Sequence, residues 1–196
     1  NALGTGPLVQ TGGTLIVNVD GAHGGAITLS GTSTLRVSDN NAIQGNTIAL
    51  NGGTLDLRSN TTTTFLTGPL TLGGDATINV ANNGSGTSQT ITLGSALNVS
   101  GNRTLTLTNA NSFFQNLASI ALAGDLTLNS AISASVQSIS EDGTPRRFIK
   151  TGAGTTTLTG PGTFSGGAEV LAGLLIAGTR ESATLKRAAG FGVVMP

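Results

Sequence analysis

The chain repeats itself with a period of about 20 residues, and this repeat constrains the fold more than any other feature of the sequence. Residues 1–17 read NALGTGPLVQTGGTLIV, and residues 41–57 read NAIQGNTIALNGGTLDL. Asn, Ala, an aliphatic residue and Gly-Gly-Thr-Leu recur at the same offsets, and a weaker copy, AITLSGTSTLRV, occupies residues 26–37. Self-similarity at a short fixed period is typical of a solenoid, in which one unit is stacked many times.

Each repeat contains two short runs in which aliphatic and polar residues alternate, and this period of two predicts strands with one apolar face. The first runs are Ile27–Leu29, Ile48–Leu50, Leu70–Leu72 and Ile91–Leu93. The second runs are Leu15–Val17, Leu35–Val37, Leu55–Leu57 and Ile78–Val80. Because glycine accepts the backbone conformations of tight bends, corners are expected at Gly12-Gly13, Gly31, Gly52-Gly53, Gly73-Gly74, Gly94 and Gly124.

These runs can be arranged as an antiparallel sandwich or as a parallel β-helix. Only in the β-helix, where each repeat makes one coil, do equivalent residues become neighbours, so the matching offsets favour it. The prediction is an all-β β-solenoid of about eight coils, a rod on the order of 40 Å long at the usual spacing of strands.

The same register predicts a ladder on the outer surface. Ile16, Arg36, Asp56 and Asn79 each follow the equivalent aliphatic residue in successive coils. Arg36 and Asp56 are then adjacent and oppositely charged. The expectation is a surface ion pair worth at most about 1 kcal/mol.

The second half of the chain is less regular. Strand patterns continue at Arg103–Leu107, Ser119–Leu122 and Asp125–Leu128, whereas Phe113-Phe114 interrupts them and is expected to fill the core or a widened coil. Residues 138–149 are predicted to be an exposed charged loop between the runs Ile132–Ile139 and Phe148–Lys150. The charges grouped in this segment are Glu141, Asp142, Arg146, Arg147 and, directly after the loop, Lys150. Residues 1–179 are assigned to one solenoid, and residues 180–196 to a cap, a linker or an exchanged strand.

Composition excludes several classes of protein. The 196 residues carry nine basic and nine acidic side chains, and this balance argues against binding to nucleic acid or an anionic membrane, which requires a basic face. It has no Cys, which excludes disulfides and thiolate chemistry, and no apolar stretch long enough to predict a transmembrane helix. It begins at Asn1 rather than Met, and the expectation is a segment of a longer protein.

Candidate catalytic acids are scattered along the sequence. Glycoside hydrolysis uses two carboxylates that face each other across the sugar. Glu141 and Asp142 are adjacent but fall in the charged loop, and Asp20 and Asp39 are the next candidates because both follow the second run of neighbouring repeats. All four are interpreted as solvated turn residues; the other acids are Asp56, Asp75, Asp125, Glu169 and Glu181.

Other motifs are equally weak. His23 is the only histidine and lies among small residues, so neither a metal site of several histidines nor a catalytic triad is expected. Gly73-Gly74-Asp75 is an isolated fragment of a calcium repeat, and Gly152-Ala153-Gly154 lacks the context of a nucleotide-binding loop. Trp and Tyr, the usual platforms for sugars, are absent. No catalytic, cofactor-binding or metal-binding residue is predicted, and no cofactor.

Residues 150–179 read KTGAGTTTLTGPGTFSGGAEVLAGLLIAGT. This stretch resembles the passenger-associated transport repeat of bacterial autotransporters, whose pattern begins K-x-G-x-G-T-L-x-L-x-G-x-N-T and continues with an aromatic residue, Ser or Thr, and Gly-Gly. Thr156, Gly162 and Glu169 depart from the pattern, where Leu, Asn and Thr are usual. The matching positions are Lys150, Gly152, Gly154, Thr155, Leu158, Gly160, Thr163, Phe164, Ser165, Gly166, Gly167, Val170, Gly173 and Leu174.

The resemblance covers about 30 residues and implies a right-handed parallel β-helix of an autotransporter passenger, secreted or displayed on the bacterial cell surface, with a repeat tied to secretion and folding rather than catalysis. The expected function is a non-enzymatic structural or adhesive stalk. Its expected partners are a host or neighbouring-cell surface or a glycan, without nucleic acid and without insertion in a membrane. One alternative is a filament subunit that self-associates through open solenoid ends; a weaker one is a carbohydrate-active β-helix enzyme.

Overall fold

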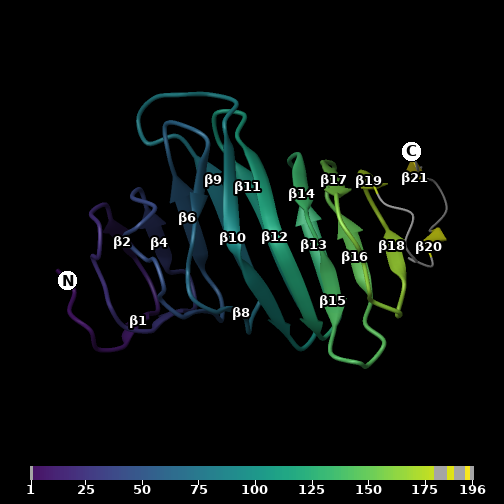
Figure 1. The fold of residues 1–196 in the computed structure, drawn as a ribbon, viewed down its shortest axis with the longest axis horizontal. Coiled ribbons are helices and arrows are strands. Elements are labelled where there is room, and N and C mark those ends of the chain that lie inside the picture. The colour runs from purple at the N-terminus through teal and green to yellow at the C-terminus, as the bar shows by residue number, and fades with distance from the viewer. Residues whose placement is uncertain (1, 179–184, 188–192, 195–196) are drawn as a thin grey trace.

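The computed structural model describes residues 2–178, 185–187 and 193–194, and its strands pair in parallel from coil to coil. Figure 1 shows these strands side by side along a rod, with β1 and β2 at one end and β18 and β19 toward the other. The fold is a β-solenoid of about eight turns, as the repeat predicts, and the antiparallel sandwich is excluded.

Within the described residues, two parallel sheets form the walls of the solenoid, and each coil contributes strands to both. Sheet A has twelve strands: β1 (Leu8–Gln10), β3 (Ile27–Leu29), β5 (Ile48–Leu50), β8 (Leu70–Leu72), β10 (Thr90–Ser100), β12 (Phe114–Ala123), β14 (Ala134–Val136), β17 (Thr155–Leu158), β19 (Leu174–Ala177) and β21 (Val193–Val194), with β7 (Thr63–Phe65) beside β10 and β15 (Ile139–Glu141) beside β12. Sheet B has nine: β2 (Thr14–Val17), β4 (Thr34–Val37), β6 (Thr54–Arg58), β9 (Ala76–Ala81), β11 (Arg103–Asn109), β13 (Leu126–Ser130), β16 (Phe148–Thr151), β18 (Ala168–Val170) and β20 (Leu185–Arg187).

The core is a set of stacked aliphatic columns between the two sheets. In sheet A, Leu29, Leu50 and Leu72 are partners in register on successive strands, and each is fully buried. In sheet B, Leu35 and Leu55 stack in the same way. Each buried side chain of this size contributes about 1.5–3 kcal/mol through removal from water, so the columns are the main source of stability.

Glycines let successive coils approach closely at the corners. A Cβ atom on Gly124 would lie 2.1 Å from the carbonyl carbon of Gly101 in the preceding coil, so only glycine fits there. Gly94 does not mark a corner, contrary to the prediction. It lies inside β10, at a register shift between Leu93 and Ala96, because this long strand pairs with both β7 and β8 of the preceding coil.

Three further features of the second half differ from the sequence-based expectation or extend it. Phe113 is buried and fills the core as expected, but Phe114 begins β12 and does not interrupt the pattern. The run Ile132–Ile139 is divided into β14 and β15, which both pair with β12. Of residues 180–196 only β20 and β21 are described; they pair in parallel with β18 and β19, and the rest of this predicted cap lies outside the described residues.

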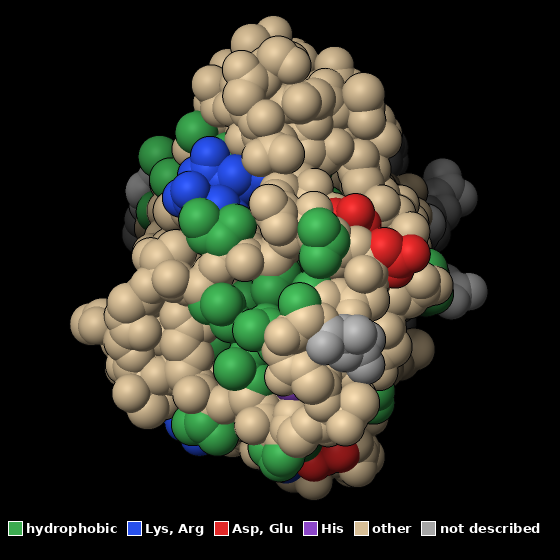
Figure 2. Space-filling view, turned by 90° about the vertical axis from the view of Figure 1, so that its left-hand side faces the viewer, with side chains coloured by type: hydrophobic (Ala, Val, Ile, Leu, Met, Phe, Trp, Pro, Cys, Tyr) green, Lys and Arg blue, Asp and Glu red, His purple; other side chains and the backbone are tan. Residues whose placement is uncertain are grey.

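The first coil forms one end of the described rod. Leu8 and Leu15 pack against the core but are only partly buried, because no described coil lies on their other side. Figure 2, which faces this end, shows apolar side chains gathered at its centre. Among the described residues, β1 and β2 are therefore edge strands, each with a partner on one side.

Candidate functional site on the outer face of sheet B

Two columns of polar side chains run along the outer face of sheet B. One is a threonine column in strict register, made of Thr14, Thr34, Thr54, Thr77 and Thr106. The other is the predicted ladder, in which Ile16, Arg36, Asp56 and Asn79 are successive Cα partners. The register predicted from the sequence is thus confirmed, and β11 extends it by one step to Thr108.

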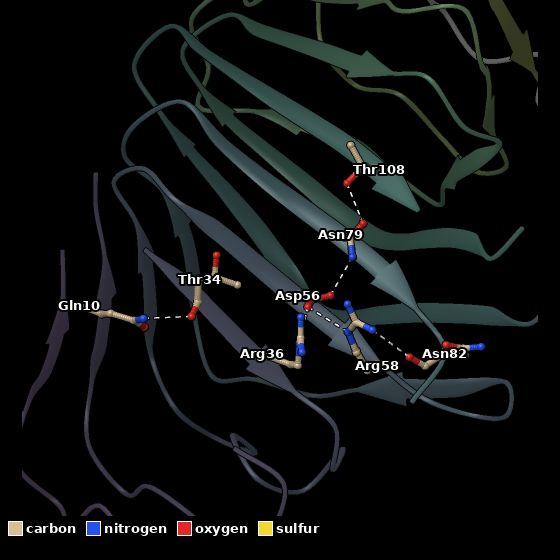
Figure 3. Close-up of polar contacts among 8 residues, drawn as sticks. All are labelled: Gln10, Thr34, Arg36, Asp56, Arg58, Asn79, Asn82 and Thr108. Carbon is tan, nitrogen blue, oxygen red and sulfur yellow. Dashed lines mark hydrogen bonds and ion pairs between the residues drawn. The ribbon is translucent and has the colours of Figure 1, made fainter. Parts of the chain in front are cut away.

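Asp56 is the centre of this ladder and receives three side-chain hydrogen bonds (Figure 3). Its Oδ2 accepts from Arg36 Nε at 2.7 Å and from Arg58 Nε at 3.0 Å, and its Oδ1 accepts from Asn79 Nδ2 at 2.8 Å. The Asp56 side chain is only 4% exposed. The expectation of a solvated surface pair is therefore wrong: side chains from three adjacent strands converge on the carboxylate and replace its water.

The Asp56 cluster, defined as Arg36, Asp56, Arg58 and Asn79, carries one net positive charge. Burial alone raises the pKa of Asp56, but the hydrogen bonds from Asn79, Arg36 and Arg58 outweigh it and hold the pKa below its usual value, so the carboxylate is ionised at neutral pH. One carboxylate is shared by two guanidinium groups, whose side chains remain 35% and 25% exposed for Arg36 and Arg58.

The two guanidinium groups differ in what they leave free. Arg58 uses Nε for Asp56 and Nη1 for the carbonyl oxygen of Asn82, at 3.3 Å. Arg36 uses only Nε, and its two Nη groups donate no hydrogen bond within the described part of the chain. Arg36 is thus fixed by a buried carboxylate while its outer fork of donors faces solvent.

A groove of about 530 Å³ lies beside the cluster, on the same face of sheet B. Its lining is Gly31, Thr32, Gly53, Thr54, Asp75, Ala76, Thr77, Thr104 and Thr106. The side chains of Thr54, Thr77 and Thr106 form no hydrogen bond with any other described residue, so their hydroxyl groups can bind a ligand. Asp75 is exposed in the groove, and one of its carboxylate oxygens accepts a 2.8 Å hydrogen bond from the backbone nitrogen of Thr104.

The acids and the histidine singled out from the sequence lie elsewhere. Asp20 is exposed beyond the end of β2, and Asp39 Oδ1 accepts a 2.9 Å hydrogen bond from the backbone nitrogen of Asn41, which is the geometry of a turn. His23 is 5% exposed and lies beneath the first coil, where Leu3 N donates to Ala22 O. No described contact joins Asp20 to Asp39, and both acids fit the interpretation of turn residues.

The predicted loop 138–149 is shorter in the structure, because Ile139–Glu141 form β15 of sheet A and the buried Phe148 begins β16. The charges of this segment hold the turn between the two strands. Glu141 accepts from Ser165 Oγ at 2.6 Å and from Arg146 N at 2.8 Å, and the Ser165 bond lowers the pKa of Glu141. Asp142 pairs with Arg146 at 2.8 Å, and Arg147 pairs with Glu169 of β18. Glu141 and Asp142 are therefore engaged in fixing the loop and do not face each other across an open space.

Lys150 is the charged residue that sequence reasoning placed wrongly, because it was grouped with the charges of the exposed segment and is buried instead. It is completely buried in β16, and its Nζ donates to the carbonyl oxygens of Ser130 at 3.3 Å, Gly152 at 2.8 Å and Ala172 at 3.4 Å, and to that of Thr151. Burial lowers the pKa of Lys150 to about 8. The ammonium group thus ties three successive coils at one corner. The signal was the alternation itself, which places Lys150 on the same face as Phe148.

The glycine motifs are accounted for by stacking. A Cβ atom on Gly74 would lie 2.5 Å from the carbonyl oxygen of Asn51, and one on Gly154 would lie 2.2 Å from that of Ile132.

Within residues 2–178 and the two short described segments beyond them, no group of three or more His, Cys, Asp or Glu side chains is placed to hold a metal ion. The same part of the chain contains no helix long and apolar enough to cross a membrane.

Comparisons with known protein families, with curated proteins and with solved structures found no match for this chain.

Proposed function

We propose that the chain is a non-enzymatic structural and adhesive segment of an exported bacterial surface protein, a stiff stalk of the autotransporter passenger type. The observation that carries the proposal is the continuous parallel pairing of both sheets over one apolar core, from β1 and β2 to β18 and β19. In a solenoid of this kind each coil packs directly on its neighbours, so the rod is stiff and holds its two ends at a fixed separation.

The sequence of the last described coils supports the exported setting. Residues 150–179 resemble the passenger-associated transport repeat, and several residues that match its pattern stabilise the stacking of coils in this chain. Lys150 binds carbonyl oxygens of three coils, and Gly152 and Gly173 adopt positive φ angles of 76° and 73° at the corner around it.

Surface display tests this proposal. We would insert residues 2–178 in place of an equal number of coils in a displayed passenger and add protease to intact cells. The inserted coils should be exposed to the protease, and a Gly124→Ala variant, which disrupts stacking, should be displayed less. Retention of a correctly folded insert inside the cell would contradict the proposal.

The first described coil supports a second candidate, a filament subunit. The outer edges of β1 and β2 have no strand partner among the described residues, and Leu8 and Leu15 are only partly covered. Such an edge can template a further coil from another copy. Light scattering should then rise with protein concentration, and replacing the exposed Val9 of β1 by Lys should suppress the rise. A scattering mass that stays monomeric over the accessible range of concentration would exclude this candidate.

A further inference from the structure

We propose that the outer face of sheet B from β4 to β11 binds a carboxylate-bearing polysaccharide, and that Arg36 selects the carboxylate. The inference rests on the adhesive role proposed above and gives that role a site and a class of ligand. Its elements are the Asp56 cluster and the adjoining threonine groove, which lie on the same strands.

Arg36 presents a fixed fork of hydrogen-bond donors. Asp56 binds its Nε at 2.7 Å from a buried position, whereas both Nη groups lack a partner among the described residues and the side chain is 35% exposed. A guanidinium group held on one edge loses little conformational freedom when it binds a ligand with the other. Its planar pair of donors matches a carboxylate, which it binds through two parallel hydrogen bonds.

The charges on this face orient an anionic ligand. The Asp56 cluster has two guanidinium groups for one carboxylate, and therefore one uncompensated positive charge. Asp75 lies in the groove on the opposite side of the threonine column, four positions before Asn79 in the chain. An acidic chain in the groove is repelled by Asp75 and attracted by Arg36, so its carboxylates face the cluster.

The threonine column provides the remaining contacts. Thr54, Thr77 and Thr106 are in register on neighbouring strands, which are about 4.8 Å apart, so their hydroxyl groups form a row along the rod axis. Each hydroxyl can donate one hydrogen bond and accept others. A regular row of free hydroxyl groups suits a polyhydroxylated chain lying along the axis better than it suits a compact ligand. An extended glycan with carboxylates along one side satisfies both the row and the cluster.

Titration calorimetry with polygalacturonate tests the site, with the methyl-esterified polymer as the matched ligand. Esterification removes the carboxylate charge but keeps the sugar backbone and its hydroxyl groups. The protein should bind polygalacturonate, bind the ester at least about tenfold more weakly, and lose affinity as salt is added. Equal binding of both polymers, or no binding of polygalacturonate, would overturn the proposal.

Variants assign the contact to Arg36. Arg36→Gln should weaken binding of polygalacturonate about tenfold or more, because a charged bidentate contact is lost. Arg147→Gln removes an exposed arginine at the other end of sheet B and is the matched control, with no change in binding expected. Unchanged binding by Arg36→Gln, or an equal loss in the control, would contradict the assignment.

A second variant separates binding from folding. Thr77→Val keeps the shape and strand preference of the side chain and removes its hydroxyl, so the thermal unfolding temperature should stay near that of the native chain while affinity falls several-fold. Unchanged affinity would exclude the threonine row from the site. Cleavage of the polymer by the native chain would contradict the adhesive role and indicate an enzyme. Because surface display does not depend on Arg36 or Thr77, failure here leaves the stalk proposal standing.

Discussion

Asp56 shows how one acid on an outer face can become part of the structure. A carboxylate that projects from a sheet normally keeps its water, but here Arg36, Arg58 and Asn79 take the place of that water. Removing one partner of such a cluster costs more than an exposed pair contributes, because the remaining charges stay close together without compensation.

We therefore expect Asp56→Asn to lower the free energy of unfolding by about 2 kcal/mol, a value below that for fully buried pairs because both arginines reach solvent. Chemical denaturation measures the loss. Asp142→Asn, which breaks a pair in the turn between β15 and β16, is the control and should have a smaller effect. Equal effects of the two variants would show that the Asp56 cluster contributes no more than a surface pair.

The same residue makes stability depend on acid. Its pKa in the folded chain lies below the ordinary value of 3.8, so the folded form retains the carboxylate charge after the unfolded form has been protonated. The stabilisation is complete above pH 3.8 and is lost as the pH falls through the folded pKa. In acid titrations followed by denaturation, Asp56→Asn should lack this part of the loss. Parallel curves for the variant and the native chain would be inconsistent with the hydrogen bonds described here.

Lys150 has the opposite dependence on pH. Burial lowers its pKa to about 8 from 10.5, so between these values the unfolded chain binds more protons than the folded one. Stability should therefore rise with pH in that interval, by at most about 1.4 kcal/mol per unit from this group. Lys150→Met should abolish the rise, which urea denaturation at several pH values measures. The chain has no Tyr or Cys that could titrate in this interval, and its other lysine is Lys186. Lys186→Met is therefore the control and should keep the rise. A rise that is lost in Lys186→Met and kept in Lys150→Met would contradict the assignment to Lys150.

At the scale of elements, the corner glycines decide how closely coils stack. A Cβ atom on Gly124 would overlap the backbone of Gly101, at 2.1 Å from its carbonyl carbon, whereas one on Gly6 would meet nothing within 4 Å. Gly124→Ala should lower the free energy of unfolding by about 2 kcal/mol or more through forced separation of β12 and β13 from the preceding coil. Gly6→Ala should change it by less than about 0.5 kcal/mol. Thermal denaturation compares the two, and similar values for both would contradict the role assigned to this corner.

Regular elements were predictable because one period carries the information for all of them. The alternation of Leu35 and Leu55 with polar residues fixes the inward face, and equal offsets then fix which outer residues become neighbours, so Arg36 beside Asp56 followed from the sequence. The sequence did not predict that two side chains, Arg36 and Arg58, bind the same oxygen of Asp56. Arg58 lies two residues beyond Asp56 on the same strand, and its Nε contact depends on a rotamer that no period encodes.

The departures have equally specific causes. Gly94 has the composition of a corner, but β10 pairs with two strands of the preceding coil and runs through it with a shift of register. Lys150 has the charge of a surface residue, and its burial depends on carbonyl groups of coils about 20 residues before and after it. Both depend on contacts between coils that differ from the average repeat. In the threonine groove, the register of the threonines follows from the repeat, whereas the shape of the groove does not.

At the scale of the whole molecule, the protection of backbone amides from hydrogen exchange depends on the position of a coil along the rod. Each inner coil is covered on both sides, whereas β1 and β2 have a neighbouring strand on one side only among the described residues. Amide hydrogen exchange should therefore be faster in β1 and β2 than in β11, which lies between β9 and β13. Exchange followed by mass spectrometry resolves these segments. Equal protection of β1 and β11 in a monomer would show that the chain opens as one unit rather than from its end.

The buried ammonium of Lys150 also has a mechanical consequence. A load applied along the rod axis pulls successive coils apart, and each coil that detaches releases roughly 20 residues, or about 70 Å of extended chain. Most coils are joined by backbone hydrogen bonds and apolar contact, but two charged groups each join three coils. Asp56 accepts hydrogen bonds from side chains of β4, β6 and β9, and Lys150 donates to carbonyl groups in or next to β13, β16 and β18. Rupture that starts at the first coil should therefore proceed in steps of one coil until it reaches either group, where a single larger force releases several coils together. The rod would yield gradually at its first coil and hold at Asp56 and again at Lys150.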